Sequence, residues 1–364
     1  MSGAGPSGRG SRRVSGVKRA VAAGAVLAAM AGLASCSQSS AAPHSPTSSG
    51  ATSSSAEPPL QAPTPTVVVS GVPFATNLTF DQHGGLWFTS GARGQNSTGG
   101  VWYVPPGGRP RHVVTGLSAS GLAWVGNRLY VGSLTTPGIG RITIFEGFNG
   151  SRFTSQRVLL DNVNVGQHII GSIVLGPDGR LYFGVGAAGD ATGPSGSVLS
   201  IAPDGGNPVV KATGLRSAFG LAFYGRLLLV TDTGRDDLGP FRPPEKLNEF
   251  NPAGPVVNFG FPGCYDQGGP ACAGTRPPLA TFPAHATPSG VAVKGDVAFV
   301  VENGSSFLQN PSGSDIQRVD LRTGRHTVFW RSPVKHDPVG AAIGPDGNLY
   351  VTLVASGKIV RFDL

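Results

Sequence analysis

Charged residues, sulfur-containing residues and uninterrupted helix-forming stretches are all scarce in this sequence. Asp, Glu, Lys and Arg make up 13% of its 364 residues, and it has three Cys and two Met. After residue 62, no stretch free of both Gly and Pro is longer than 151–165. Helix interiors tolerate Gly poorly and Pro hardly at all, so this pattern excludes a helical bundle or coiled coil. The 56 Gly and 31 Pro instead favour one large all-β domain of short strands and many turns.

Residues 1–35 have the pattern of an export signal that is removed from the mature protein. Five basic residues and no acid precede an apolar run over 20–34, which is too short to span a bilayer. Ser15 and Gly16 stand where a twin-arginine signal carries bulky apolar residues, so we expect the general secretory route. Without these five cations the formal net charge falls from +8 to +3, and no basic stretch with interleaved aromatics remains. Nucleic acid is therefore not an expected partner.

The signal ends in Leu33-Ala34-Ser35-Cys36, which resembles the bacterial lipobox, where the Cys becomes the lipid-bearing first residue. The alternative is an ordinary cleavage site with a chance Cys. Residues 36–62 are rich in Ser, Ala, Thr and Pro and predict a disordered tether. We therefore expect an extracytoplasmic protein that is attached to the bacterial cell membrane only through a lipid on Cys36.

A hairpin pattern recurs six times between residues 63 and 364. Each copy has an apolar run, a turn, Leu or Val, and a second apolar run. The equivalent positions are Leu86, Leu129, Leu181, Leu227, Val297 and Leu349. Their spacing of 43 to 70 residues fits units of four short strands. A β-sandwich would not repeat one motif six times, and a β-solenoid coil would have about half this period, so we predict a six-bladed β-propeller.

The two ends of the repeat array predict how the ring closes. The last unit stops after a third strand at 358–362, whereas the strand-like segment 66–69 has no hairpin partner of its own. We expect this N-terminal strand to join the last blade.

The long fourth interval interrupts the repeat and carries a family resemblance. It contains Thr231-Asp232-Thr233-Gly234-Arg235-Asp236-Asp237, then Pro243-Pro244-Glu245-Lys246-Leu247-Asn248, then Asn258-Phe259-Gly260-Phe261-Pro262-Gly263-Cys264. Together with segments 167–179, 214–223, 272–278 and 285–290, this series resembles the soluble quinoprotein glucose/sorbosone dehydrogenase family. Those proteins are six-bladed propellers that oxidise sugars with pyrroloquinoline quinone (PQQ) and calcium. The resemblance covers the chain from about residue 160 to its end.

The resemblance implies roles for several residues. His168 matches the general base for the sugar hydroxyl, and Arg216 matches the arginine that polarises the quinone carbonyl. Ser217 stands where the family has Asn beside this arginine, and Lys335 is a candidate to replace a basic cofactor ligand that the last blade lacks. His168 and Arg216 each have a structural alternative. His168 would be a buried structural histidine, and Arg216 would be the partner of Asp232 or Asp236.

The resemblance also implies a calcium site. The backbone carbonyls of Gly234 and Arg235 match calcium ligands, and Asp236, Asp237 and Glu245 match the acidic loop beside them. The alternatives are a solvated turn and a purely structural calcium site.

With Cys36 assigned to lipid, Cys264 and Cys272 remain as an even pair in an oxidising compartment. We expect a disulfide that pins a loop over the propeller mouth; a metal pair is the alternative.

Three functions follow from these residues. The first is a lipid-anchored oxidoreductase that oxidises a sugar or related alcohol or aldehyde with PQQ and calcium. The second is a non-catalytic propeller that binds a carbohydrate or a protein at the cell envelope. The third is a calcium-dependent lactonase-type hydrolase, for which Asp232, Glu302 and Asn303 are the available ligands.

Overall fold

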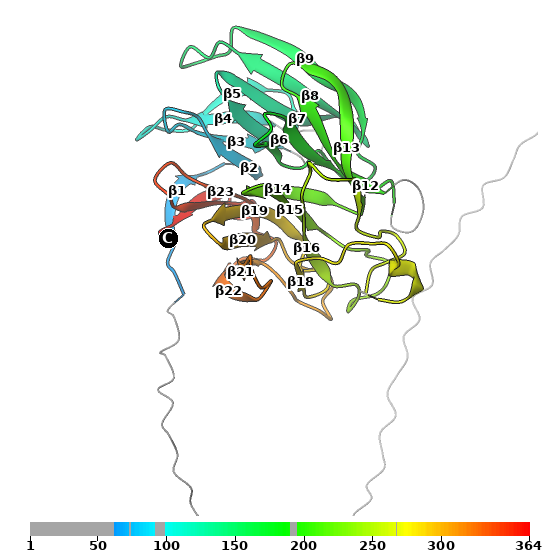
Figure 1. Ribbon diagram of the computed structural model, residues 1–364. Helices are drawn as coiled ribbons and strands as arrows, with labels where there is room; N and C mark the ends of the chain where they lie inside the picture. The colour runs from blue at the N-terminus through cyan, green and yellow to red at the C-terminus, as the bar shows by residue number, and fades with distance from the viewer. Residues whose placement is uncertain (1–61, 73, 92–98, 190–194, 267) are drawn as a thin grey trace, which may run out of the picture. The chain divides into compact units, whose positions relative to one another are not determined.

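The computed structural model describes residues 62–72, 74–91, 99–189, 195–266 and 268–364 (Figure 1). All of them belong to the compact unit Pro59–Leu364. Within these ranges no helix has the length and apolar character needed to cross a bilayer. The predicted export signal, the lipid site Cys36 and most of the tether lie outside the described residues.

Six small antiparallel sheets make up this unit, and they follow one another along the chain. The first sheet has β2 (Ala75–Phe80), β3 (Leu86–Ser90), β4 (Gly100–Val104) and β5 (Arg111–Thr115). The second has β6 (Ser118–Val125), β7 (Arg128–Thr136), β8 (Ile139–Glu146) and β9 (Ser155–Asn164). The third has β10 (Ile173–Leu175), β11 (Leu181–Val185), β12 (Gly196–Ala202), β13 (Gly205–Leu215) and the added parallel strand β17 (Val257–Asn258).

The remaining three sheets complete the set. The fourth has β14 (Ala218–Tyr224), β15 (Leu227–Asp232), β16 (Glu245–Phe250) and β18 (Ala280–Phe282). The fifth has β19 (Pro288–Lys294), β20 (Val297–Glu302), β21 (Asp315–Asp320) and β22 (His326–Arg331). The sixth has β23 (Pro338–Ile343), β24 (Leu349–Leu353), β25 (Lys358–Phe362) and β1 (Thr66–Ser70). A short 3₁₀ helix, Pro270–Cys272, lies between β17 and β18.

The six sheets form a closed ring, which confirms the predicted six-bladed propeller. The innermost strands β2, β6, β10, β14, β19 and β23 contact one another in succession, and β23 returns to β2. These strands approach so closely that a Cβ on Gly220 would collide with the Ser289 carbonyl, and one on Gly340 with the Thr76 carbonyl. This crowding explains the small residues of the inner strands.

The N-terminal strand closes the ring as predicted. β1 pairs antiparallel with β25, with Thr66 opposite Arg361 and Ser70 opposite Lys358. Val69 is buried in a core cluster that combines residues of β1, β2, β3 and β25. Closure therefore uses both backbone pairing and apolar packing.

In each sheet the inner strand begins where the second strand ends, so six such points share one rim of the ring, which we call the site rim. In the fourth blade Ala218 lies opposite Asp232, and in the fifth Pro288 lies opposite Glu302. Residues just before the inner strands or just after the second strands therefore gather on this rim.

Candidate functional site

His168 and Arg216 lie near each other on the site rim, with Gly186 between His168 and the neighbour of Arg216. His168 is half-buried just before β10, and its backbone N–H donates to the Val165 carbonyl at 3.0 Å. Gly186 lies directly against the His168 side chain, because a Cβ there would collide with the Cβ and ring of the histidine. Gly186 also forms a β-bridge to Ser217. One glycine thus separates His168 from the Arg216-Ser217 pair.

The Arg216 side chain is buried and held by an acidic pair. Its Nη2 forms an ion pair with Asp236, while the backbone N–H groups of Arg216 and Ser217 donate to Asp232 Oδ1 at 2.9 and 3.0 Å. Burial raises the pKa of Asp232, and nearby Lys246 and the two N–H donors oppose that rise. Both acids considered from the sequence as partners of Arg216 contact it: Asp236 pairs with the guanidinium, and Asp232 accepts from the backbone N–H.

The Gly234 turn lies next to this pair and holds a fully buried carboxyl. Gly234 N–H donates to Glu245 Oε2 at 2.5 Å, whereas Oε1 has no hydrogen-bond partner within the described ranges. Burial raises the pKa of Glu245 to about 8, and the charge of Asp232 adds to the rise. Arg235 points to Asp237, with contacts of 2.9 and 2.7 Å. The structure therefore brings Arg216, Asp236, Gly234 and Glu245 to one place.

His285 is a site residue to which the sequence analysis assigned no role. Its Nδ1 lies 3.4 Å from Asp236 Oδ1, its Nε2 lies 2.8 Å from the Gly239 carbonyl, and its ring packs on Phe307 at 4.3 Å. It is buried and adopts a left-handed backbone with φ 61°. Asp236 is thereby held from two sides, by Arg216 and by His285. The only sequence signal was its place in the matching segment 285–290.

Lys335, a predicted cofactor ligand, does not join this group. It is exposed in the turn between β22 and β23. Asp337, two residues later, is buried and accepts hydrogen bonds from the Ser332 and Ser356 hydroxyls and the Ser356 N–H. The role of Lys335 stays a prediction, and Asp337 anchors loops of the last blade.

The residues considered for a lactonase-type metal site have separate partners. Asp232 accepts from two backbone N–H groups, Asn303 donates to the Pro338 carbonyl, and Glu302 lies beside Asp315. Among the described residues no three His, Cys, Asp or Glu side chains are grouped to hold a metal ion. The geometry does not favour that hydrolase.

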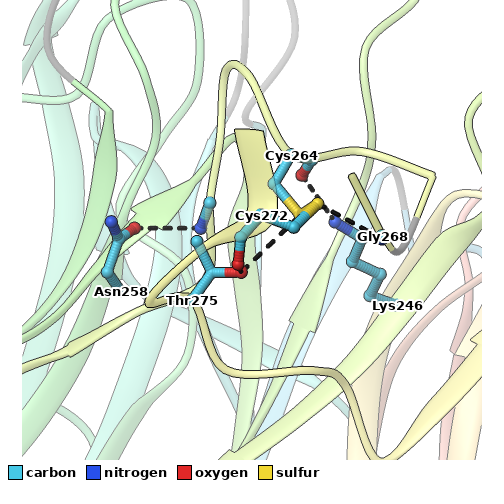
Figure 2. Close-up of a disulfide and its surroundings, with 7 residues drawn as sticks. Lys246, Asn258, Cys264, Gly268, Cys272 and Thr275 are labelled. Carbon is cyan, nitrogen blue, oxygen red and sulfur yellow. Dashed lines mark hydrogen bonds between the residues drawn. A yellow bond between two sulfur atoms is a disulfide. The ribbon is translucent and has the colours of Figure 1, made fainter. Parts of the chain in front are cut away.

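The predicted disulfide is present between Cys264 and Cys272, which confirms that pairing (Figure 2). Around it, Thr275 Oγ1 donates to the Cys272 carbonyl at 2.8 Å and Lys246 Nζ to the Cys264 carbonyl at 3.4 Å (Figure 2). Arg235 Nη1 donates to the Pro262 carbonyl at 3.1 Å. The disulfide loop is therefore tied to the Gly234 turn through Arg235 and to the start of strand β16 through Lys246.

The closed ring of six blades is a fold that this chain shares with solved sugar dehydrogenases. The holo form of the pyranose dehydrogenase PQQ domain from Coprinopsis cinerea is 17% identical, with TM-score 0.68, over 82% of this chain and 94% of that one. A Trichoderma reesei member of carbohydrate-active enzyme family AA12 has TM-score 0.70 and 17% identity over 83% and 96%. A putative oxidoreductase (glucose dehydrogenase) from Thermus thermophilus has TM-score 0.64 and 21% identity over 83% and 100%. No family model and no curated protein matches the sequence.

A calcium ion fits the Gly234 turn. Hard cations prefer oxygen ligands, and the turn offers two backbone carbonyls with the carboxyls of Asp236 and Glu245 beside them. The Glu245 oxygen that lacks a partner is buried at this point. A cation there would compensate a charge that burial otherwise disfavours.

PQQ fits this rim poorly. Its three carboxylates call for cations, but the basic side chains around the Gly234 turn already act on acids: Arg216 pairs with Asp236, Arg235 pairs with Asp237, and the charge of Lys246 acts on Asp232. Binding a tricarboxylate would require these pairs to open. We therefore derive no reaction step through this cofactor.

Proposed function

We propose that this protein is an extracytoplasmic, lipid-anchored oxidoreductase of the sugar dehydrogenase type, acting on a hydroxyl or aldehyde of a sugar or related compound. The observation that carries the proposal is that His168 packs against Gly186, which bridges Ser217 next to Arg216, while the Arg216 guanidinium is fixed by Asp236 beside the Gly234 turn. The fold shared with solved sugar dehydrogenases also supports it.

His168 and Arg216 have complementary tasks in this proposal. Oxidation of a hydroxyl releases two electrons, which must pass to a separate acceptor of the quinone or dye class, and a proton. An imidazole is suited to accept that proton at a ring nitrogen. The guanidinium of Arg216 is buried and fixed by Asp236. It would therefore supply positive charge at a defined place to an oxygen of the electron acceptor that gains electron density. Calcium held by the carbonyls of Gly234 and Arg235 would orient the reacting oxygens.

A binding propeller without catalysis is the second candidate. The specific observation in its favour is that the cations of the rim are paired with acids, which suits a neutral carbohydrate or a protein better than a tricarboxylate cofactor.

The two functions are separated by one assay. The purified full chain is incubated with calcium and excess PQQ, and reduction of an electron-accepting dye is followed on addition of aldoses, alditols and aldehydes. Sugar-dependent reduction supports the oxidoreductase. Absence of both dye reduction and quinone absorbance on the protein contradicts it, and calorimetric binding of the same sugars would then favour the binding propeller.

Lipid attachment has its own test. In a bacterial host, wild-type chain is expected in the membrane fraction and labelled by a radioactive fatty acid, because Cys36 follows a lipobox-like segment. Cys36→Ser should abolish the label. Full labelling of that variant would contradict the assignment, and Cys264→Ser serves as the control.

A further inference from the structure

A pair of buried carboxyls lies in the fifth blade, apart from His168 and Arg216. Glu302 ends β20 and Asp315 begins β21, directly opposite each other, and their exposures are 1% and 2%. The two carboxyls are within hydrogen-bonding reach of each other. Glu245 of the fourth blade adds to the negative charge felt by Glu302. A buried acid of the neighbouring blade therefore adds to the negative charge that acts on this pair.

The positive charge near this pair is small. Arg331 Nη1 lies 3.3 Å from Asp315 Oδ2, but its side chain is 67% exposed. Glu302 Oε2 accepts from Gln317 Nε2 at 3.3 Å, whereas Glu302 Oε1 has no hydrogen-bond partner in the part of the chain that the structure describes. Burial first, and then Asp315, raise the pKa of Glu302 well above its usual range. A buried carboxylate oxygen without a partner is costly unless a cation or proton compensates it.

An open pocket of about 470 Å³ adjoins the two carboxyls. Its lining includes Glu302, Asp315 and Gln317 together with Ser312, His326 and Arg331. The pocket has room for an ion and several water molecules. Glu302 therefore lines a space that solutes can enter.

The side-chain amide of Gln317 can present a third oxygen to the space beside Glu302 and Asp315. In the present orientation its Nε2 donates to Asp315 Oδ1 at 3.0 Å and its Oε1 lies 3.0 Å from His326 Nδ1. His326 Nε2 lies 3.1 Å from the Thr281 carbonyl, so both ring nitrogens face oxygen acceptors. Turning the Gln317 amide over would point its Oε1 at the carboxyl pair and let its Nε2 donate to His326 Nδ1. The His326 Nε2–H would keep its hydrogen bond to the Thr281 carbonyl.

We propose that Glu302, Asp315 and the turned amide of Gln317 form a calcium site at the edge of the fifth blade, completed by water from the pocket. Two carboxylates and an amide carbonyl are hard oxygen donors, and calcium accepts six to eight ligands in flexible geometry. The ion would neutralise the buried pair and release Arg331 to solvent. The site shares no proposed ligand with the Gly234 turn, whose candidate ligands are two backbone carbonyls and the carboxyls of Asp236 and Glu245, and it does not depend on the proposed oxidoreductase activity.

Calcium binding to the full chain tests this site without any activity assay. The protein is stripped with EDTA, dialysed, and titrated with calcium chloride alone in a calorimeter, and the number of bound ions is determined. The double variant Glu302→Gln/Asp315→Asn is expected to bind one ion fewer and to lose part of the calcium-induced rise in Tm. The matched control Glu146→Gln/Asp161→Asn, which changes half-exposed carboxylates of the second blade, should match wild type.

A second variant keeps the proposal testable if the double variant does not fold. Arg331→Ala removes the exposed competitor of the ion and should tighten calcium binding at least threefold. Terbium bound at this site should also luminesce on excitation of Trp330, which neighbours Arg331 on β22. Equal numbers of bound ions in wild type and double variant, weaker binding by Arg331→Ala, or no binding below millimolar calcium would each overturn the proposal.

Discussion

Buried acids set the electrostatics of the site rim at the residue scale. Glu245 is fully buried, one of its oxygens has no hydrogen-bond partner among the residues that the structure describes, and Asp232 is also buried. The resemblance identified Glu245 as a loop acid near calcium, but residue spacing carries no information about burial or about a missing partner. The same holds for His285, whose contact with Asp236 depends on a loop from the next blade.

The raised pKa of Glu245 predicts a pH dependence of stability. Its ordinary value is 4.5 and burial raises it to about 8, so the folded state is favoured by protonation. The stability from this group is fully present below pH 4.5 and is lost as pH rises through 8, at about 1.4 kcal/mol per pKa unit. In EDTA, Glu245→Gln should unfold near the wild-type temperature at pH 5 and several degrees above it at pH 9. Parallel Tm curves for the two proteins would contradict this expectation.

At the scale of single elements, the β-hairpins are the part of the fold that the local sequence could predict. In the third blade Asp178 Oδ2 accepts from the Tyr182 hydroxyl at 2.8 Å, and in the sixth Asp346 Oδ2 accepts from that of Tyr350 at 3.0 Å. The spacing of Asp, Gly and Leu-Tyr is thus explained by contacts within one hairpin. These contacts are local, so the repeat and its strands could be predicted.

The long fourth interval was less predictable. β17 has only two residues and pairs in parallel with β13 of the preceding blade, and β18 pairs with β16 after an insertion of about thirty residues. No periodicity marks a two-residue strand, and its partner is set by tertiary contacts. The disulfide was predictable because only two cysteines remained after Cys36 was assigned to lipid.

The disulfide is expected to stabilise its loop rather than the ring. Closing this short loop contributes roughly 2.5 kcal/mol in the chain-entropy model. Cys264→Ser/Cys272→Ser should therefore lower Tm moderately and expose 258–276 to limited proteolysis, while the β-sheet circular dichroism stays unchanged. Proteolysis at the wild-type rate would show that Lys246 and Thr275 hold the loop without the disulfide.

Buried hydroxyls join neighbouring blades at the scale of the whole molecule. Thr231 Oγ1 donates to the Ser289 carbonyl at 2.7 Å, and Ser289 Oγ donates to that of Val339 at 2.8 Å. The last contact of this kind, from Thr352 Oγ1 to the Thr76 carbonyl at 3.1 Å, spans the closure of the ring. The ring was predictable from the repeat, but these contacts join residues dozens of positions apart and could not be read from it.

Ring closure by β1 gives a prediction with an internal control. Val69 is 3% exposed, whereas Val67, two residues earlier on the same strand, is 51% exposed. Val69→Asp buries an unpaired charge in the closing blade and should cost about 3–5 kcal/mol of unfolding free energy. Val67→Asp should change it by less than about 0.5 kcal/mol. Equal effects in denaturant unfolding would mean that β1 does not close the ring in solution.

In the proposed oxidoreductase, His168 moves a proton at a site that it shares with Arg216. The most direct measurement compares sugar-dependent dye reduction by wild type, His168→Ala and His83→Ala, where His83 is an exposed histidine in the turn between β2 and β3. We expect a loss of at least about a hundredfold in kcat/KM for His168→Ala alone, with unchanged Tm in all three proteins. Wild-type activity in His168→Ala would contradict it.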